Sequence, residues 1–222
     1  MLYLVGSPIG NLSDITLRAL QVLKDVTIVA AEDTRRSLIL LERYEIRKPL
    51  ISFHEHNEAK RTAELIDRMR TGETVALLTD AGMPSISDPG YRIVRASIQA
   101  GIRVEVIPGP SAVITAIVGS GLPTDRFYYG GFLPIKAGQR QRELVAALAR
   151  EVTSVYFESP HRIARSLEIL RDADPSRSIC VARELTKRHE EYRRGAVAEV
   201  LAHYESHPPK GEITLLIAGS ND

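Results

Sequence analysis

The chain has one cysteine, no tryptophan and few other aromatic residues, which make up 5% of its 222 positions. A single cysteine, Cys180, excludes an intramolecular disulfide and a cysteine cluster that holds zinc. Because Cys180 lies in an apolar run, we expect a buried and unreactive thiol. The sequence also lacks an uncharged apolar stretch of membrane-spanning length and the pattern of a signal peptide. We therefore expect a cytoplasmic protein with no membrane partner.

The sequence has little net charge, +1 at pH 7, so no overall field indicates a nucleic-acid partner. Arginine outnumbers lysine, however, and arginine suits the recognition of phosphates and bases, so a local basic surface stays open. The hydrophobic fraction of 44% and the charged fraction of 26% are typical of a globular protein. The length fits one large domain or two small ones, each able to bury a core.

In the first half, apolar runs typical of strands alternate with helical patterns. The expected strands are 2–5, 26–31, 74–78 and 103–107, and the expected helices are 14–24, 37–44, 58–70, 91–100 and 112–119. Ser13 is the expected cap of the first helix. This alternation predicts a mostly parallel sheet with helices on both faces, an α/β fold.

The segment 119–125, which is rich in glycine and small residues, is the best candidate for a linker. It divides the chain into an expected N-terminal α/β domain, 1–120, and an expected C-terminal α/β domain, 121–222. The strands expected in the second domain are 127–129, 154–157, 178–182 and 213–218, and the helices are 140–150, 163–170 and 196–204.

The stretch TDAGMPSISDPG, residues 79–90, directly follows an expected strand. Ligands of open α/β sheets bind outside the carboxyl ends of the strands, where Asp80 could accept hydrogen bonds and Gly82 would let a ligand approach the backbone. Asp, Gly and Pro are also ordinary turn residues, so this stretch alone leaves a ligand site and a polar turn equally open.

Three further loops at the expected sheet edge are polar or glycine-rich: 6–11, 32–36 and 108–112. GSPIGN lacks the G-x-G-x-x-G pattern of a dinucleotide-binding loop. The sequence also contains no GK[ST] element, which argues against a P-loop nucleotide hydrolase. A helix beginning at Ser111 and Ala112 would offer free N–H groups to a ligand. Together the loops favour a cofactor cleft over unrelated turns.

Two charged stretches follow strands of the second half, FESPHR at 157–162 and RELTKRHEE at 183–191. They could face one cleft, or they could be solvated strand ends and a charged helix face. His54 and His56 could share a strand face, but no third ligand has suitable spacing. We therefore expect hydrogen bonding in a loop and no metal site.

Ten motifs occur in the order of one family: GSPIGNLSDITLRA, EDTR, HEHNE, TDAGMPSISDPG, PGPSA, SGLPTDRF, GFLP, FESPHR, RELTK and KGE. From Leu4 to Gly219 the chain resembles the tetrapyrrole-methylase superfamily, and within it the 2′-O-ribose methyltransferases of small-subunit ribosomal RNA. The resemblance implies two α/β domains, S-adenosylmethionine bound between them, a homodimer, and methylation of a cytidine ribose in the small ribosomal subunit.

Matching positions imply three sets of site residues. The implied cofactor-binding residues are Pro8, Asp80, Met83, Ser111, Ala112, Phe157, Leu185 and Ile213. The implied catalytic residues, among which a base and an orienting group are not separated, are Glu158, Arg183, Glu184 and Lys187. The candidates for phosphate contacts are Arg35, Arg36, Arg162, Lys187 and Arg188.

Thr79 and Met83 stand where relatives more often have serine and threonine. Relatives usually continue into a small C-terminal region after the KGE strand, so we expect free RNA to be a poor substrate for this chain. Two alternatives remain at this stage. One is a methylase of a porphyrin or corrin precursor, and the other is a noncatalytic RNA-binding module. EDTR and FESPHR favour RNA, and Asp80 with the PGPSA turn favours catalysis.

Overall fold

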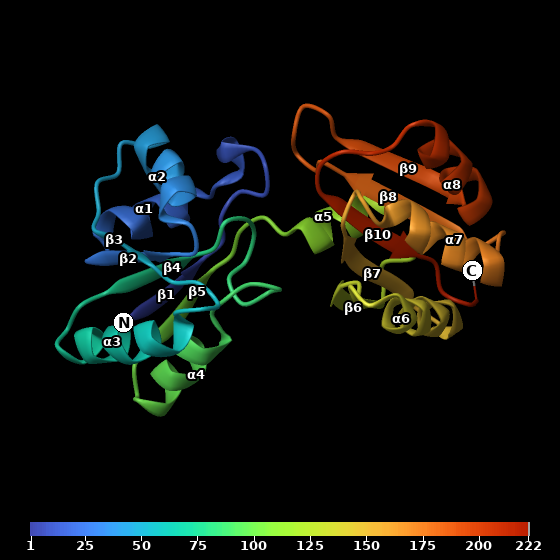
Figure 1. Cartoon of the computed structure of the whole chain (residues 1–222). Coiled ribbons are helices and arrows are strands. Elements are labelled where there is room, and N and C mark those ends of the chain that lie inside the picture. The colour runs from blue at the N-terminus through green and yellow to red at the C-terminus, as the bar shows by residue number, and fades with distance from the viewer. Residues whose placement is uncertain (222) are drawn as a thin grey trace. The chain divides into compact units, whose positions relative to one another are not determined.

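The computed structural model describes residues 1–221 and divides the chain into two compact units, Met1–Ser111 and the part that begins at Ala112 (Figure 1). Both units are built of helices and strands, as expected for two α/β domains. We call them unit 1 and unit 2.

Unit 1 contains a five-stranded sheet in the order β3-β2-β4-β1-β5, in which every pairing is parallel. Its strands are β1 (Leu2–Val5), β2 (Ile28–Ala31), β3 (Leu50–Ser52), β4 (Val75–Leu78) and β5 (Val104–Ile107). All residues of the inner strands β2 and β4 are buried, as is typical of a parallel sheet covered on both faces. The short edge strand β3 was not predicted, because three residues give too little pattern.

Helices cover both faces of this sheet. They are α1 (Leu17–Asp25), α2 (Thr34–Arg43), α3 (Glu58–Arg70) and α4 (Tyr91–Gln99), with a short 3₁₀ turn η1 (Leu12–Asp14) before α1. Helices α1 and α2 lie on one face and α3 and α4 on the other (Figure 1). Side chains of α1 and α2 pack with Val29, Ala76 and Leu78, whereas those of α3 and α4 pack with Val75 and Leu77. The parallel sheet with helices on both faces is confirmed.

In unit 1, two helix starts differ from the predictions, and side-chain caps explain both. The first helix begins at Leu17 because the Thr16 hydroxyl accepts from the Ala19 N–H, so Ser13 is not its cap. The second begins at Thr34, three positions before the expected Ser37, because the Asp33 carboxylate accepts from the Arg35 N–H. In unit 2, the helix expected at 140–150 begins at Ala137, and no side-chain cap marks its start.

Unit 2 contains a mixed five-stranded sheet in the order β6-β7-β10-β8-β9. Its strands are β6 (Phe127–Phe132), β7 (Thr153–Glu158), β8 (Ser178–Arg183), β9 (Glu191–Ala196) and β10 (Ile213–Ile217). Only β6 and β7 pair in parallel. Strand β9 was not predicted, since its sequence EYRRGA is largely polar; it is an edge strand and can bear exposed charges.

The helices of unit 2 are α5 (Ala112–Ser120), α6 (Ala137–Ala149), α7 (Ile163–Ala173) and α8 (Val197–Ser206). Side chains of α6, α7 and α8 form the main core with Tyr156, Val181 and Leu215 on one face of the sheet. Helix α5 packs against β8, β9 and β10. Cys180 is buried on β8, and burial raises the pKa of its thiol to about 11, which confirms the expected unreactive cysteine.

The packing of α5 moves the division of the chain from the expected position after residue 120 to Ser111. The Tyr192 hydroxyl on β9 donates to the Thr115 carbonyl on α5, and the Tyr192 ring lies against Gly119. Glycine residues near 119–125 therefore serve a helix contact inside unit 2. Throughout residues 1–221, no helix combines the length and the apolar composition needed to cross a membrane.

Gly119 and Gly138 provide a matched pair of glycine-to-alanine substitutions in helices. A Cβ at Gly119 would overlap the Tyr192 ring, whereas a Cβ at Gly138 on α6 meets no atom within 4 Å. Gly119→Ala should lower the free energy of unfolding by about 1–3 kcal/mol through overpacking. Gly138→Ala should raise it by about 0.5 kcal/mol through lower chain entropy. Urea denaturation measures both, and equal effects would contradict the assigned contact.

Candidate functional site

The loops that follow β1, β4 and β5 are joined at the carboxyl edge of the unit 1 sheet. Ser7 and Gly82 exchange two backbone hydrogen bonds of 2.8 and 3.1 Å, and the Ser7 hydroxyl donates to the Thr79 carbonyl at 2.9 Å. A Cβ on Gly6 would lie 2.7 Å from the Gly109 Cα, so only glycine permits this approach of the two backbones. The junction lies at β1 and β4, neighbouring strands from which the chain leaves in opposite directions, toward β2 and β5. Such a switch point is the usual ligand site of an open α/β sheet.

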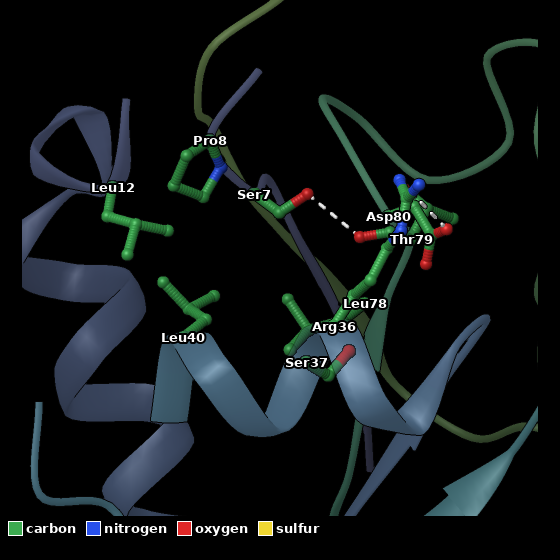
Figure 2. A pocket seen from close by; sticks show the side chains of 9 residues that line it. All are labelled: Ser7, Pro8, Leu12, Arg36, Ser37, Leu40, Leu78, Thr79 and Asp80. Atoms are coloured by element: carbon green, nitrogen blue, oxygen red, sulfur yellow. Dashed lines mark hydrogen bonds and ion pairs between the residues drawn. The ribbon is translucent and has the colours of Figure 1, made fainter. Parts of the chain in front are cut away.

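A small, open pocket lies at this switch point. Figure 2 shows the side chains of Pro8, Leu12 and Leu40 pointing into one space, with the polar groups of Ser7 and Asp80 on another side of it. The complete lining comprises Ser7, Pro8, Leu12, Arg36, Ser37, Leu40, Leu78, Thr79 and Asp80. Apolar walls with a few fixed polar groups are typical of a small-molecule site.

Asp80 occupies the polar side of this pocket and is held by its neighbours. Its Oδ1 accepts from the Asp33 N–H at 3.0 Å, and its Oδ2 lies 3.4 Å from Nη1 of Arg36. The Asp80 N–H in turn donates to the Glu32 carboxylate at 3.2 Å. The ends of β2 and β4 are thus connected through two acidic side chains, and the Asp80 side chain keeps 27% of its surface exposed.

Two further carboxyl groups near Asp80 have raised pKa values. Burial raises the pKa of Asp88 to about 7, and the charges of Glu32 and Asp80 add to the effect. Burial also raises the pKa of Glu32, against the opposing effect of its backbone hydrogen bond with Asp80. A cationic ligand group placed here would relieve the mutual repulsion of these carboxylates.

The loop between Gly82 and Gly90 has an unusual backbone that Glu58 holds in place. Ser85 and Ser87 adopt positive φ angles of 74° and 61°, which are costly for residues other than glycine. The buried Glu58 carboxylate on α3 accepts from the Gly90 N–H at 3.1 Å and from the Arg92 N–H at 3.4 Å. Strained residues cluster at functional sites, where the surrounding structure holds them.

Only some of the predicted cofactor-binding residues lie at the pocket of unit 1. Pro8 and Asp80 line the same pocket. Met83 is half-buried, with its sulfur close to Gly6 and so beside the same junction. Ser111 is the last residue of unit 1, and Ala112 begins α5 in unit 2. Neither residue lines the described pocket.

In unit 2, the register brings the remaining predicted residues to one edge of the sheet. Ile213 at the start of β10 pairs with Glu158 at the end of β7 and with Arg183 at the end of β8. Phe157 precedes Glu158, and Leu185 is buried two positions after Arg183. Glu158 and Ile213, which lie more than fifty positions apart, are therefore neighbours, and FESPHR and RELTK leave their strands at the same edge of the sheet.

Both carboxylate oxygens of Glu158 have partners within the protein. Its side chain has 0% exposure, and its Oε1 accepts from the Ser159 N–H at 2.6 Å and pairs with Nη2 of Arg162 at 2.6 Å. Its Oε2 accepts from the Ser166 hydroxyl at 2.7 Å. Both oxygens thus fix the turn between β7 and α7, which makes Glu158 a poor candidate for accepting a proton from a substrate.

Lys187 joins two carboxylates across the edge. Its Nζ lies 2.9 Å from Glu184 and 2.9 Å from Glu212, and Glu184 also accepts from the Glu212 N–H. Burial alone would raise the pKa of Glu184 and lower the pKa of Lys187. Hydrogen bonds outweigh burial: those from the Glu212 N–H and from Lys187 lower the pKa of Glu184, and those to Glu184 and Glu212 raise the pKa of Lys187. Both groups stay charged at neutral pH, which suits orientation and charge stabilisation.

Arg183, the remaining predicted catalytic residue, is half-buried beside this triad. Its Nε donates to Glu191 at 3.0 Å and its Nη1 donates to the Lys210 carbonyl at 3.1 Å. Burial would raise the pKa of Glu191, but Arg183 and Arg193 outweigh that effect and lower it. Arg183 thus connects β8 to β9 and to the KGE turn.

The five cations predicted to contact phosphate have different surroundings. Arg35 pairs with Asp33 at 2.7 Å, Arg36 with Asp80, Arg162 with Glu158 and Lys187 with two glutamates. Arg188 is exposed and forms no ion pair with any residue of the described chain, so it has the greatest freedom to meet a phosphate.

His54 and His56 lie in the turn after β3, with ring centroids 5.9 Å apart. The His54 N–H donates to the Asn57 side chain, and the His54 ring contacts the Asn57 amide at 3.1 Å, which confirms hydrogen bonding in a loop. Within residues 1–221, no group of three His, Cys, Asp or Glu side chains has an arrangement that could hold a metal ion.

Several residues at the two sheet edges were not predicted from the sequence as site residues. Ser7 and Thr79 lie inside quoted motifs but were not assigned to the cofactor, although they line the pocket with Pro8 and Asp80. Glu212 lies in KGE, and its link with Lys187 spans 25 positions. The motif boundaries indicated these positions, but only the fold shows their contacts.

Comparison with known proteins agrees with the two-sheet architecture. The family model of the tetrapyrrole (corrin/porphyrin) methylases matches residues 1–201, so the chain belongs to this family. Two relatives are named ribosomal RNA small subunit methyltransferase I. The Thermotoga maritima protein is 46% identical, with 98% of each chain covered. The Mesorhizobium japonicum protein is 50% identical, with 97% of this chain and 74% of the relative covered.

A solved structure of similar fold is the uroporphyrin-III C-methyltransferase of Thermus thermophilus in complex with S-adenyl homocysteine. It has a TM-score of 0.66 and 21% identity, and covers 97% of this chain and 96% of the solved chain. This likeness shows the fold.

The raised pKa of Asp88 predicts a pH-dependent stability. In the folded protein the pKa of Asp88 is about 7, so its proton stays bound up to about that pH, whereas the ordinary pKa of an aspartate carboxyl is 3.8. The free energy of unfolding should therefore fall as pH rises from 4 to 7. Asp88→Asn should remove this loss and add about 1 kcal/mol at pH 8, after allowance for solvent screening, with little effect at pH 4.

Urea unfolding at both pH values measures this difference, and Asp125→Asn at an exposed carboxylate is the matched control. Equal stabilisation at both pH values would contradict the raised pKa of the half-buried Asp88.

Proposed function

We propose that this protein transfers a methyl group from S-adenosylmethionine to ribosomal RNA of the small ribosomal subunit. The observation that supports it most is the identity of 46% and 50% to relatives named for that activity, over nearly the whole chain. The two polar sheet edges give this assignment a physical basis, with the donor held by unit 1 and the acceptor oriented by unit 2.

The unit 1 pocket fits the chemistry of the proposed donor. S-adenosylmethionine supplies an activated methyl group when bound, and it has a cationic sulfonium and a cationic amine. Asp80 faces the pocket beside Glu32 and Asp88, whose pKa values are raised. A cation placed among these carboxylates would gain favourable charge interactions, and Pro8 and Leu40 offer apolar contacts.

The unit 2 edge fits the orientation of an acceptor more than the removal of its proton. Lys187 and Glu184 are held in fixed charge states, and Arg183 is anchored at two points. Fixed charges of this kind stabilise charge that develops in a transition state without reorganising. We therefore assign orientation to Lys187, Glu184 and Arg183, support of the β7–α7 turn to Glu158, and proton acceptance to water.

The finer features rest on the motif resemblance. We propose that the acceptor oxygen is a cytidine ribose 2′-hydroxyl, that the protein is a homodimer, and that it acts in the cytoplasm on ribosomal subunits. A porphyrin or corrin acceptor has less support, because the structural likeness to a porphyrin methylase has only 21% identity. A noncatalytic RNA-binding role would not explain the acidic pocket of unit 1.

Asp80 should be required for donor binding. Asp80→Asn keeps the shape of the side chain but removes its charge, so affinity for S-adenosylmethionine should fall about tenfold or more through loss of a charge-assisted contact. Isothermal titration calorimetry measures the affinity, and Asp67→Asn on the exposed surface of α3 is the control. An unchanged affinity in Asp80→Asn would remove Asp80 from the donor site.

Methyl transfer itself is tested with labelled donor and small ribosomal subunits that lack the modification, followed by mapping of the labelled nucleotide. Lys187→Ala should lower the turnover about a hundredfold with donor affinity unchanged, since orientation of the acceptor acts on the transition state. Lys60→Ala, at an exposed lysine of α3, is the control. Absence of label in the RNA with the wild-type protein would exclude the proposed function.

A further inference from the structure

Aromatic side chains are scarce in this chain but concentrated at one place. The sequence has four phenylalanines and eight tyrosines, and six of these twelve residues belong to the neighbouring strands β6 and β7. Tyr156 faces the helix-covered core of unit 2, whereas Phe157, the next residue along the strand, points to the opposite face.

Three of these rings form a contiguous group, which we call the aromatic platform: Tyr129, Phe132 and Phe157. The Phe157 ring lies 5.5 Å from Tyr129 and 5.3 Å from Phe132, measured between ring centroids. Phe157 is half-buried between its neighbours, while Phe132 keeps 61% of its surface exposed. An exposed ring supported from behind by a second ring offers a flat apolar surface.

A bulge in β6 places Phe132 at this position. Tyr129 pairs with Val155 and Phe132 pairs with Phe157, so two residues of β6 lie opposite one residue of β7. The two are glycines, and Gly131 has a φ of 69°. Without the extra residue, Phe132 would point to the other face of the sheet. The bulge formed by the two glycines therefore keeps the Phe132 ring on the outer face of the sheet.

The end of β6 that carries Phe132 belongs to a cationic edge. Lys136 follows it, and Arg188 and Lys210 lie in the loops after β8 and before β10; all three are exposed and outside any ion pair among residues 1–221. Of the carboxylates at the same edge, Glu158 is paired with Arg162, and Glu184 and Glu212 are paired with Lys187, whereas the exposed Glu190 forms no ion pair among residues 1–221. Three unpaired cations against one unpaired carboxylate leave an excess of positive charge at the edge that carries the exposed rings, and this combination binds single-stranded nucleic acid.

We propose that the aromatic platform stacks a base of unpaired RNA, and that Phe132 is the ring in direct contact. This inference rests on the proposed function, because it names how the acceptor strand is held beside the unit 2 edge. Single-stranded RNA is recognised by stacking of splayed bases on exposed aromatic rings. The platform would position a nucleotide without reading its identity, since every base has a face that stacks.

Phe132→Leu tests this directly, because leucine stays apolar but has no ring. Fluorescence anisotropy with a short, unstructured, pyrimidine-rich RNA should show about tenfold weaker binding for Phe132→Leu and wild-type affinity for Phe132→Trp. Tyr91→Leu, at an aromatic side chain of α4 with 67% exposure, is the matched control and should bind as the wild type does.

Affinity for S-adenosylmethionine should be unchanged in Phe132→Leu. Loss of donor affinity in parallel with RNA affinity would assign the platform to the cofactor and overturn the proposal. Equal RNA binding by Phe132→Leu and wild type, or no RNA binding by the wild type, would also overturn it. So would a change of oligomeric state in sedimentation without a change in RNA affinity, since that result assigns the rings to a protein interface. The labelled transfer to small subunits tests the proposed function separately, because it needs only the wild-type protein.

Discussion

The approach of two glycine backbones, Gly6 and Gly109, is the constraint on which the geometry of unit 1 depends. A side chain on either residue would overlap the other backbone. Their contact brings the loops after β1 and β5 together, and the paired hydrogen bonds between Ser7 and Gly82 add the loop after β4. Because the three loops share one junction, backbone contacts fix the position of the pocket.

Charge is distributed differently at the two sheet edges. In unit 1, carboxyl groups gather at the sheet edge, and burial, with a smaller contribution from their mutual repulsion, raises the pKa values of Asp88 and Glu32. In unit 2, Lys187 pairs with Glu184 and Glu212, and further cations remain unpaired. The first arrangement favours a cationic small molecule, and the second favours a polyanion. This division of charge matches a methyl donor with a sulfonium and an acceptor with a phosphate backbone.

Glu158 shows how a motif residue can matter without acting on a substrate. FESPHR places a carboxylate, a histidine and an arginine after a strand, which is also the pattern of a catalytic site. In the fold, Glu158 binds Arg162 and Ser166 and is shielded from solvent. Glu58 has a similar part in HEHNE, because its carboxylate holds the start of α4 and the strained loop before it. Both residues support loops that carry the polar edges.

The sequence alone determined the α/β class, most helices and strands, and the positions of the polar loops at strand ends, since these follow from local periodicity and turn residues. Two domains were implied by the motif resemblance, and the turn residues at 119–125 did not mark the division between them. It could not determine β3 or β9, whose patterns are short or polar, or the caps at Thr16 and Asp33. The tertiary structure decided which polar residues are free and which are bound. Links such as Glu58 to Gly90 and Lys187 to Glu212 join residues far apart in sequence. No local pattern encodes such links, because they form only when the strands have brought their ends to one edge of a sheet.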